Sequence, residues 1–228
     1  MEQELSKKDL VKLVVSRYLM ALLAMGVLFF VPAGTLDYWQ AWVYLIILFL
    51  PMLFLILYLL KNNPALLARR MKTRETEVQQ SLIIKLSFIP FLVAFILPGF
   101  DHRLGWSSIT PFWVILADAL VLAGYGIVIW VFRENQYASR VVEVSDSQSV
   151  ISSGPYHHVR HPMYVGILLI YILSPLALGS LWAVIPAVFI LPVIIFRILN
   201  EEKVLARDLS GYTAYMQQTR YRLMPGIW

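Results

Sequence analysis

Residues 162–196 form a run of 35 residues that contains no acidic, basic or histidine side chain. As a single α-helix this run would be about 52 Å long, whereas the hydrocarbon core of a bilayer is about 30 Å thick. A run of this length therefore has to turn back on itself. The pairs Ser174-Pro175 and Gly179-Ser180 provide turn residues near its middle. The sequence predicts a tight helical hairpin in the membrane, with its tip at residues 173–181.

Four further apolar segments precede the hairpin, at residues 11–31, 39–60, 82–97 and 111–132. The chain is 59% hydrophobic and 14% charged, whereas a soluble domain usually carries about 25% charged residues. The segment at 82–97 is only just long enough to cross a bilayer. We predict an all-α fold: a polytopic integral membrane helix bundle with about six membrane-crossing segments, of which the last two form the hairpin.

The basic residues are distributed unevenly over this predicted topology. Of the 19 Lys and Arg residues, 18 fall on one side, and only Arg103 lies in a loop on the other. Basic residues concentrate on the cytoplasmic side of membrane proteins, so we expect both termini to be cytoplasmic. A single crossing in place of the hairpin would put the basic C-terminal tail outside and remove this bias. The bias therefore supports the hairpin, and it explains the net charge of +5 without a nucleic-acid partner.

Cysteine is absent from the sequence, which excludes disulfides, a thiol nucleophile and a thiolate metal site. The charged start of the chain precedes a long apolar segment without an A-x-A-like cleavage site, so we expect a retained first helix. The sequence contains no internal repeat and no linker long enough to divide it.

The predicted cytoplasmic loop after the fourth segment is rich in polar residues. Its valine-rich centre, 141–144, predicts a short extended piece. The loop ends in Arg160-His161-Pro162, and proline suits the first turn of the helix behind it. The unpaired N–H groups of that turn and the helix dipole favour an anion there. Two alternatives remain open: Arg160 binds lipid phosphates while His161 caps the helix, or His158 and His161 bind a metal together with a glutamate.

The end of the hairpin's second helix carries a second polar group. Arg197 and Glu201 are four residues apart and share a helix face, although an exposed ion pair of this kind contributes little by itself. The hairpin turn brings this end next to the start of the first hairpin helix, and residues 209–215 predict a short amphipathic C-terminal helix beside both. The resulting patch would consist of Tyr156, Arg160, His161, Tyr164, Arg197, Glu201 and Glu202.

Several motifs at characteristic spacing lie within residues 130–225. They are Asn135, Gly154-Pro-Tyr156, Arg160-His-Pro-Met-Tyr164-Val-Gly166, Glu201-Glu202 and Gly211-Tyr212 with Tyr215. This combination resembles the isoprenylcysteine carboxyl methyltransferase family, within a wider group that includes integral-membrane phospholipid methyltransferases. The preceding residues match only as apolar helices.

The resemblance implies S-adenosylmethionine as cofactor and no metal. It implies one domain, 1–228, with transmembrane helices in 1–132 and the cofactor-binding catalytic region in 133–228. Arg197 and Glu201 would be the catalytic residues, and Arg197 would orient a substrate carboxylate. The cofactor would be held by Tyr156, Arg160, His161, Pro162, Tyr164, Glu201 and Glu202.

The expected reaction is carboxyl O-methylation of an isoprenylcysteine-type lipidated acceptor at the cytoplasmic membrane surface. N-methylation of a phospholipid headgroup is an alternative, and it requires a base because the amine must lose a proton. A non-catalytic membrane scaffold or a small transporter is a further alternative. A transporter usually places charges near the bilayer midplane, whereas Asp118 is the one charged residue well inside a predicted span.

Overall fold

The computed structural model describes residues 6–71, 78–138, 144 and 148–228, except for the side chains of 78–87. The described chain is 75% helical and contains no strand, which confirms the all-α prediction. The valine-rich piece predicted to be extended lies almost wholly outside these residues, as do Lys72, Arg74 and Arg140. The helices are α1 (Lys7–Ala33), α2 (Trp39–Asn62), α3 (Pro64–Arg70), α4 (Val78–Leu104), α5 (Pro111–Glu134), η1 (Gly154–His157), α6 (Pro162–Ala177), α7 (Val184–Val188), α8 (Ile190–Asp208) and α9 (Tyr212–Gln218).

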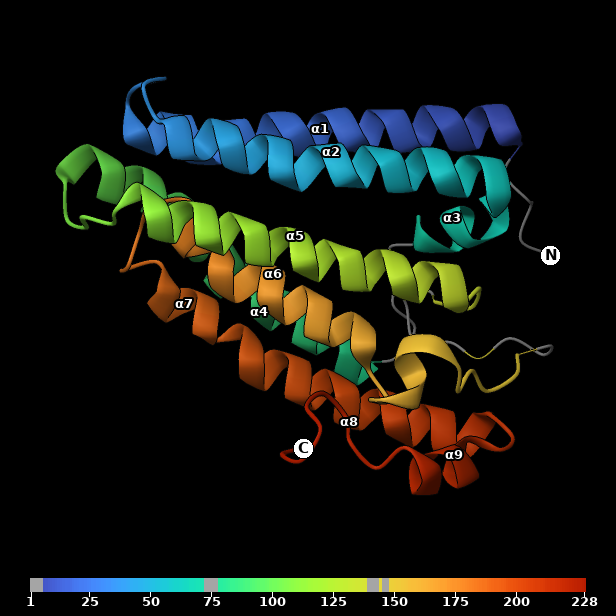
Figure 1. The fold of residues 1–228 in the computed structure, drawn as a ribbon. Helices are drawn as coiled ribbons and strands as arrows, with labels where there is room; N and C mark the ends of the chain where they lie inside the picture. The colour runs from blue at the N-terminus through green and yellow to red at the C-terminus, as the bar shows by residue number, and fades with distance from the viewer. Residues whose placement is uncertain (1–5, 72–77, 139–143, 145–147) are drawn as a thin grey trace.

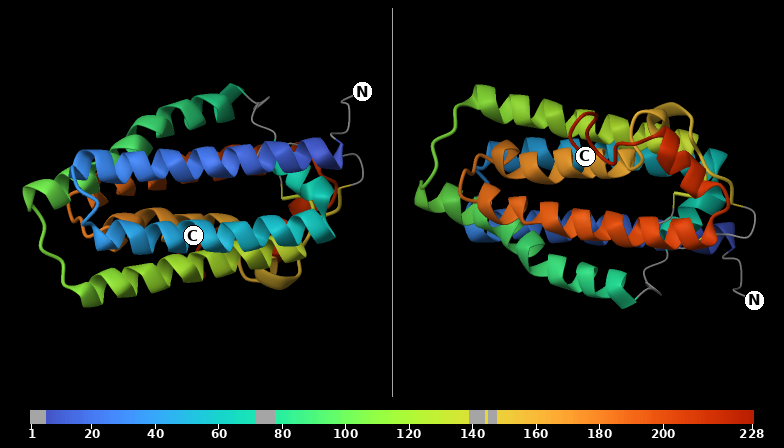
Figure 2. Two further views of the ribbon diagram at one scale, coloured as in Figure 1. Left: turned by 90° about the horizontal axis from the view of Figure 1, so that it is seen from above. Right: turned by 90° about the horizontal axis from the view of Figure 1, so that it is seen from below.

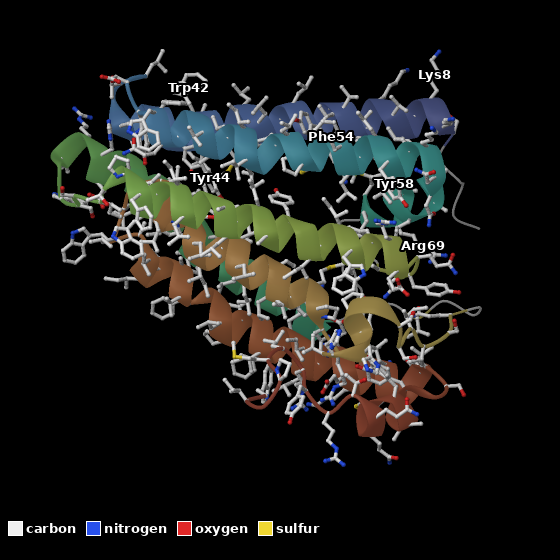
Figure 3. All side chains as sticks on the ribbon, in the orientation of Figure 1. Lys8, Trp42, Tyr44, Phe54, Tyr58 and Arg69 are labelled. Atoms are coloured by element: carbon white, nitrogen blue, oxygen red, sulfur yellow. The ribbon has the colours of Figure 1, made fainter. Side chains whose placement is uncertain are left out.

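The long helices run side by side along one axis (Figure 1). Neighbouring helices contact each other in the order α1, α2, α5, α6, α8, α4, and α4 closes the ring against α1 (Figure 2). One end of the bundle carries the N-terminus, α3, η1 and α9, and we call it the site end. The opposite end carries the turns after α1, α4 and α6. Lys8 and Arg69 lie at the site end, whereas Trp42 lies toward the other (Figure 3).

Within the described residues, four helices are long and apolar enough to cross a membrane: α1, α2, α5 and the continuous stretch Val184–Asp208 that contains α7 and α8. The length and apolar composition of these helices indicate an integral membrane protein. The apolar helix α6 is shorter, with 16 residues, and α4 has 27 residues, part of which lies outside the described side chains. The count of six crossings stays a prediction.

The predicted hairpin consists of α6 on one side of a turn and α7 with α8 on the other. The turn lies after Ala177, within the predicted tip at 173–181 and at the second of its two turn pairs, Gly179-Ser180. Helix α6 continues through Pro175 for two further residues, although proline lacks the N–H that would bond the carbonyl four positions earlier. Membrane helices tolerate proline in this way. The chain reverses at Gly179, whose φ of +77° is in the left-handed region.

Two differences from the sequence prediction have local causes. Helix α4 begins four residues before and ends seven residues after the predicted 82–97 segment. Its polar end is stabilised because Asp101 accepts hydrogen bonds from the Ser107 N–H and hydroxyl, both at 2.7 Å, and from the Ser180 hydroxyl at 2.5 Å. Helix α3 was not predicted, although Asn63 caps it by accepting from the Leu66 N–H at 3.0 Å.

Close packing of α5 against α6 fixes the start of α6 relative to the bundle. Gly124 and Gly166 face each other where these helices cross. A Cβ atom on Gly124 would lie 2.8 Å from the Gly166 carbonyl oxygen, and one on Gly166 would lie 2.7 Å from the Gly124 carbonyl oxygen. The two backbones can therefore approach this closely only because neither residue has a side chain.

Candidate functional site

An open pocket lies at the site end of the bundle, with about 890 Å³ of empty volume that includes some open solvent. Its walls come from the loop before α6, the first turn of α6, the C-terminal half of α8, and α9. The polar and aromatic residues that line it are Asn135, Tyr137, Gln148, Ser149, Tyr156, Arg160, His161, Tyr164, Arg197, Glu201, Tyr212 and Tyr215.

The segment before α6 is held in place by the C-terminal tail. The backbone N–H of Arg160 donates to the Tyr221 carbonyl at 2.9 Å, and that of His161 donates to the Arg222 carbonyl at 3.0 Å. Pro162 occupies the first turn of α6, as the sequence predicted. The tail therefore fixes both residues at the mouth of the helix, although it lies some sixty positions further along the chain.

A buried carboxylate, Glu202, joins this segment to α8 and the tail. Its Oε1 accepts from Arg160 Nε at 2.7 Å and lies 3.2 Å from His161 Nε2, and its Oε2 accepts from Arg222 Nε at 2.8 Å. Arg160 Nη1 also donates to the carbonyls of Thr219 and Arg220, at 2.9 and 3.0 Å. Arg160 is 7% exposed, and the His161 side chain makes no capping hydrogen bond. The contacts therefore do not support the alternative in which Arg160 binds lipid phosphates and His161 caps α6.

A second chain of contacts faces the pocket itself. The Tyr164 hydroxyl donates to Glu201 Oε2 at 2.6 Å and accepts from Arg197 Nε at 2.8 Å. Glu201 Oε1 lies 4.0 Å from His161 Nδ1, and the Glu201 side chain is 24% exposed. These contacts hold the Glu201 carboxylate at the pocket wall with access to a ligand, because Tyr164 is buried and orients it from behind.

The aromatic wall is built around Tyr156 in η1. Asn135 Nδ2 donates to the Tyr156 hydroxyl at 2.8 Å, and the Tyr215 hydroxyl donates to the Tyr156 carbonyl at 2.8 Å. Burial raises the pKa of the Tyr156 hydroxyl well above its usual range, so this group is neutral at physiological pH. Tyr156 and Tyr215 therefore form a wall that is neutral and hydrogen-bonded throughout.

The structure brings most of the sequence-predicted site residues together. Those that line the pocket are Tyr156, Arg160, His161, Pro162, Tyr164, Arg197 and Glu201. Glu202 is not among the lining residues, and both of its oxygens are engaged with Arg160, His161 and Arg222. Among the described residues no group of three or more His, Asp or Glu side chains is arranged to hold a metal ion.

Six further polar or aromatic lining residues were not predicted as site residues: Asn135, Tyr137, Gln148, Ser149, Tyr212 and Tyr215. Asn135, Tyr212 and Tyr215 belong to the motifs that carried the resemblance, so their spacing was a usable signal. Gln148 and Ser149 belong to none of these motifs and gave no local signal.

Part of the chain, including the predicted site residues, matches a known family. Residues 112–210 match the family model described as phospholipid methyltransferase, which is part of the wider isoprenylcysteine and phospholipid methyltransferase group. A search of curated proteins found no match. The matched stretch runs from α5 to the end of α8 and includes every predicted site residue. Over this stretch the chain is similar to membrane-embedded methyltransferases that use an S-adenosylmethionine-type donor.

Proposed function

We propose that this chain transfers a methyl group from S-adenosylmethionine to the carboxylate of an isoprenylcysteine-type lipidated acceptor. The observation that supports this most is the pocket in which His161, Tyr164, Arg197 and Glu201 converge, at the end of apolar helices and inside the family-matched stretch. The proposal keeps the division expected from the sequence, with 1–132 as membrane helices and 133–228 as the catalytic region.

The chemistry of the pocket residues suits S-adenosylmethionine. This cofactor is a sulfonium cation with an ammonium group and ribose hydroxyls, which are all suited to a carboxylate such as Glu201. Its purine is suited to an aromatic and aliphatic wall, which Tyr156, Tyr215 and Leu205 provide. We assign cofactor binding to Tyr156, His161, Pro162, Tyr164 and Glu201. Arg160 and Glu202 support the site from behind, because their contacts are with each other and with the tail.

Methyl transfer to a carboxylate depends mainly on alignment. The acceptor is ionised at neutral pH, so the chain has to hold the acceptor oxygen in line with the methyl carbon and the sulfur. S-adenosylmethionine, when bound, supplies an electrophilic methyl group. Because a carboxylate and a sulfonium give two neutral products, exclusion of water at the membrane boundary favours the reaction. Arg197 steers the carboxylate; it also stabilises the ground state, so its main effect is on orientation.

N-methylation of a phospholipid amine is the second candidate. The family description names phospholipid methyltransferases, and the 4.0 Å approach of His161 Nδ1 to Glu201 Oε1 offers a base for the proton that an amine must lose. A lipid acceptor of either kind can reach the pocket from the bilayer, since the pocket adjoins the ends of membrane helices.

The proposed location of the site is cytoplasmic. Lys8 and Arg69 lie at the site end (Figure 3), and the basic residues of the described N-terminus, α3 and tail gather there as well. Cytoplasmic enrichment of Lys and Arg then supports an inward-facing site with both termini on the same side.

The proposal is tested by giving the purified protein, in phosphatidylethanolamine-containing vesicles, a methyl-tritiated donor and a prenylcysteine analogue. Extraction separates labelled prenylcysteine ester from labelled phospholipid. We expect label in the ester, and we expect Arg197→Lys to reduce it about tenfold or more, because lysine keeps the charge but loses the planar fork that holds a carboxylate. Label in the phospholipid alone supports the second candidate. No label in either fraction contradicts a methyltransferase and favours a scaffold or transporter.

A further inference from the structure

One buried polar atom of the pocket has no role in holding the fold together. Tyr212 is 4% exposed and lines the pocket. Its hydroxyl is buried and makes no hydrogen bond to any residue that the structure describes. A buried hydroxyl without a partner costs about 1–3 kcal/mol, and buried side-chain hydroxyls are nearly always hydrogen-bonded in folded proteins. The site therefore carries a polar group that has no partner in the described part of the chain.

The start of α9 and the packing of the ring hold Tyr212 in place. Gly211, with a φ of +84°, provides the left-handed residue that starts α9. The Tyr212 ring packs with Leu209 and Tyr215 in one buried cluster and lies 5.7 Å from the Tyr215 ring, measured between centroids. Apolar contacts therefore fix the Tyr212 ring, and the fixed ring in turn sets the position of the Tyr212 hydroxyl.

Tyr215 provides a direct internal comparison. It lies on the same short helix and also lines the pocket. Its hydroxyl, however, donates to the Tyr156 carbonyl at 2.8 Å. The two tyrosines therefore differ in what their hydroxyls do: that of Tyr215 links α9 to η1, whereas that of Tyr212 links nothing in the described chain.

We propose that the Tyr212 hydroxyl is a ligand-binding group of this pocket and that it donates a hydrogen bond to an acceptor atom of S-adenosylmethionine or of its demethylated product. This role rests on the proposed function. Glu201 accepts hydrogen bonds and suits the donor groups of the cofactor, whereas the Tyr212 hydroxyl adds a neutral donor for one of its acceptor atoms. Burial, together with Glu202 and Glu201, raises the pKa of the Tyr212 hydroxyl, which keeps it protonated as a donor at physiological pH.

The test uses the full-length protein in detergent, with Tyr212→Phe and Tyr215→Phe as a matched pair. Each variant removes one hydroxyl and keeps the ring. Two quantities are measured: the Tm without ligand, and the Kd for S-adenosylhomocysteine by calorimetry. For Tyr212→Phe we expect a Tm equal to or above that of the wild type, because an unsatisfied buried polar group is removed, and a Kd raised about tenfold.

For Tyr215→Phe we expect the opposite effect on stability: a Tm lower by a few degrees, since about 1 kcal/mol corresponds to roughly 2–4 °C in a chain of this size. Unchanged affinity in a stable Tyr212→Phe variant would overturn the proposed role. A Tyr212→Phe variant with a lowered Tm would overturn it as well, because the hydroxyl would then be structural. Failure of the wild type to bind S-adenosylhomocysteine would contradict the proposed function itself, and this role with it.

Discussion

Two buried aspartates illustrate how differently a carboxylate can be accommodated. Asp101 is 1% exposed and accepts three hydrogen bonds, from Ser107 and Ser180, which tie the end of α4 to the hairpin turn. Asp118, on α5, is 3% exposed, and neither of its oxygens has a hydrogen-bond partner in the part of the chain that is described. A buried charge without partners destabilises the folded state, so the two residues have opposite effects on stability.

These contacts predict opposite outcomes for the same substitution. Asp101→Asn should lower the stability by about 1–3 kcal/mol, because the amide nitrogen cannot accept the hydrogen bonds that a carboxylate oxygen accepts. Asp118→Asn should leave the Tm unchanged or raise it, because an ionisable group is replaced by a neutral one of the same shape. Thermal unfolding in detergent measures both. A large loss of Tm in Asp118→Asn would mean that its carboxylate has a stabilising partner.

The choice between Glu201 and Glu202 is a further question at the scale of single residues. Successive residues of a helix point about 100° apart, so the two side chains cannot serve the same purpose. Glu202→Ala should cost about 3–5 kcal/mol, because it leaves Arg160 buried without its counter-charge. Glu201→Gln should retain the wild-type Tm and weaken binding of S-adenosylhomocysteine about tenfold or more. Thermal unfolding and calorimetry on both variants measure these two effects. If Glu201→Gln lost stability and Glu202→Ala lost only affinity, the assignment of the two glutamates would be reversed.

At the scale of elements, the start of α6 depends on its close contact with α5. Gly124→Ala would bring a methyl group to 2.8 Å from the Gly166 carbonyl oxygen, whereas a Cβ on Gly126, on the same helix, would meet nothing within 4 Å. Overpacking of this kind typically costs about 1–3 kcal/mol, and alanine in place of an exposed helical glycine gains up to about 1 kcal/mol. We expect Gly124→Ala to lower the Tm and Gly126→Ala to leave it unchanged or raise it. Equal Tm values for both variants would show that the crossing tolerates a side chain.

Elements that depend on local patterns were predicted from the sequence, and those that depend on distant contacts were not. Apolar length and turn residues were sufficient for the long helices and the hairpin, and the motif spacing identified the residues that line the pocket. The full length of α4 was missed, because its polar end depends on Asp101 accepting hydrogen bonds from Ser107 and Ser180. The pairing of Arg160 with the tail could not be predicted from the sequence, because no local pattern specifies a backbone contact across sixty residues.

At the scale of the whole molecule, the two ends of the bundle differ in composition. The site end carries basic residues and the pocket, whereas Trp106 and Trp182 lie at the other end, both about half exposed. Tryptophan favours the membrane interface, so each end suits one surface of a bilayer. The absence of native cysteine makes single-cysteine labelling straightforward.

This polarity predicts the outcome of labelling in sealed vesicles. Cysteine introduced singly at Lys8 and at Trp182 should react with an impermeant reagent from opposite sides, because α1 begins at the site end and Trp182 follows the hairpin turn. Both positions can be compared in the same vesicle preparation, and detergent lysis provides the control for total reactivity. Reaction of both from the same side would contradict the hairpin and the topology.

The most direct test of the central claim is the single-turnover rate of methyl transfer as a function of pH, with a prenylcysteine analogue and phosphatidylethanolamine offered separately. A carboxylate acceptor is ionised throughout the neutral range, so the rate with the prenylcysteine analogue should be nearly constant from about pH 6.5 to about pH 8.5. A phospholipid amine must first lose a proton, so its rate would rise about tenfold per pH unit below its pKa. No turnover of the prenylcysteine analogue, together with a steep rise on the phospholipid, would contradict carboxyl methylation and support the phospholipid alternative.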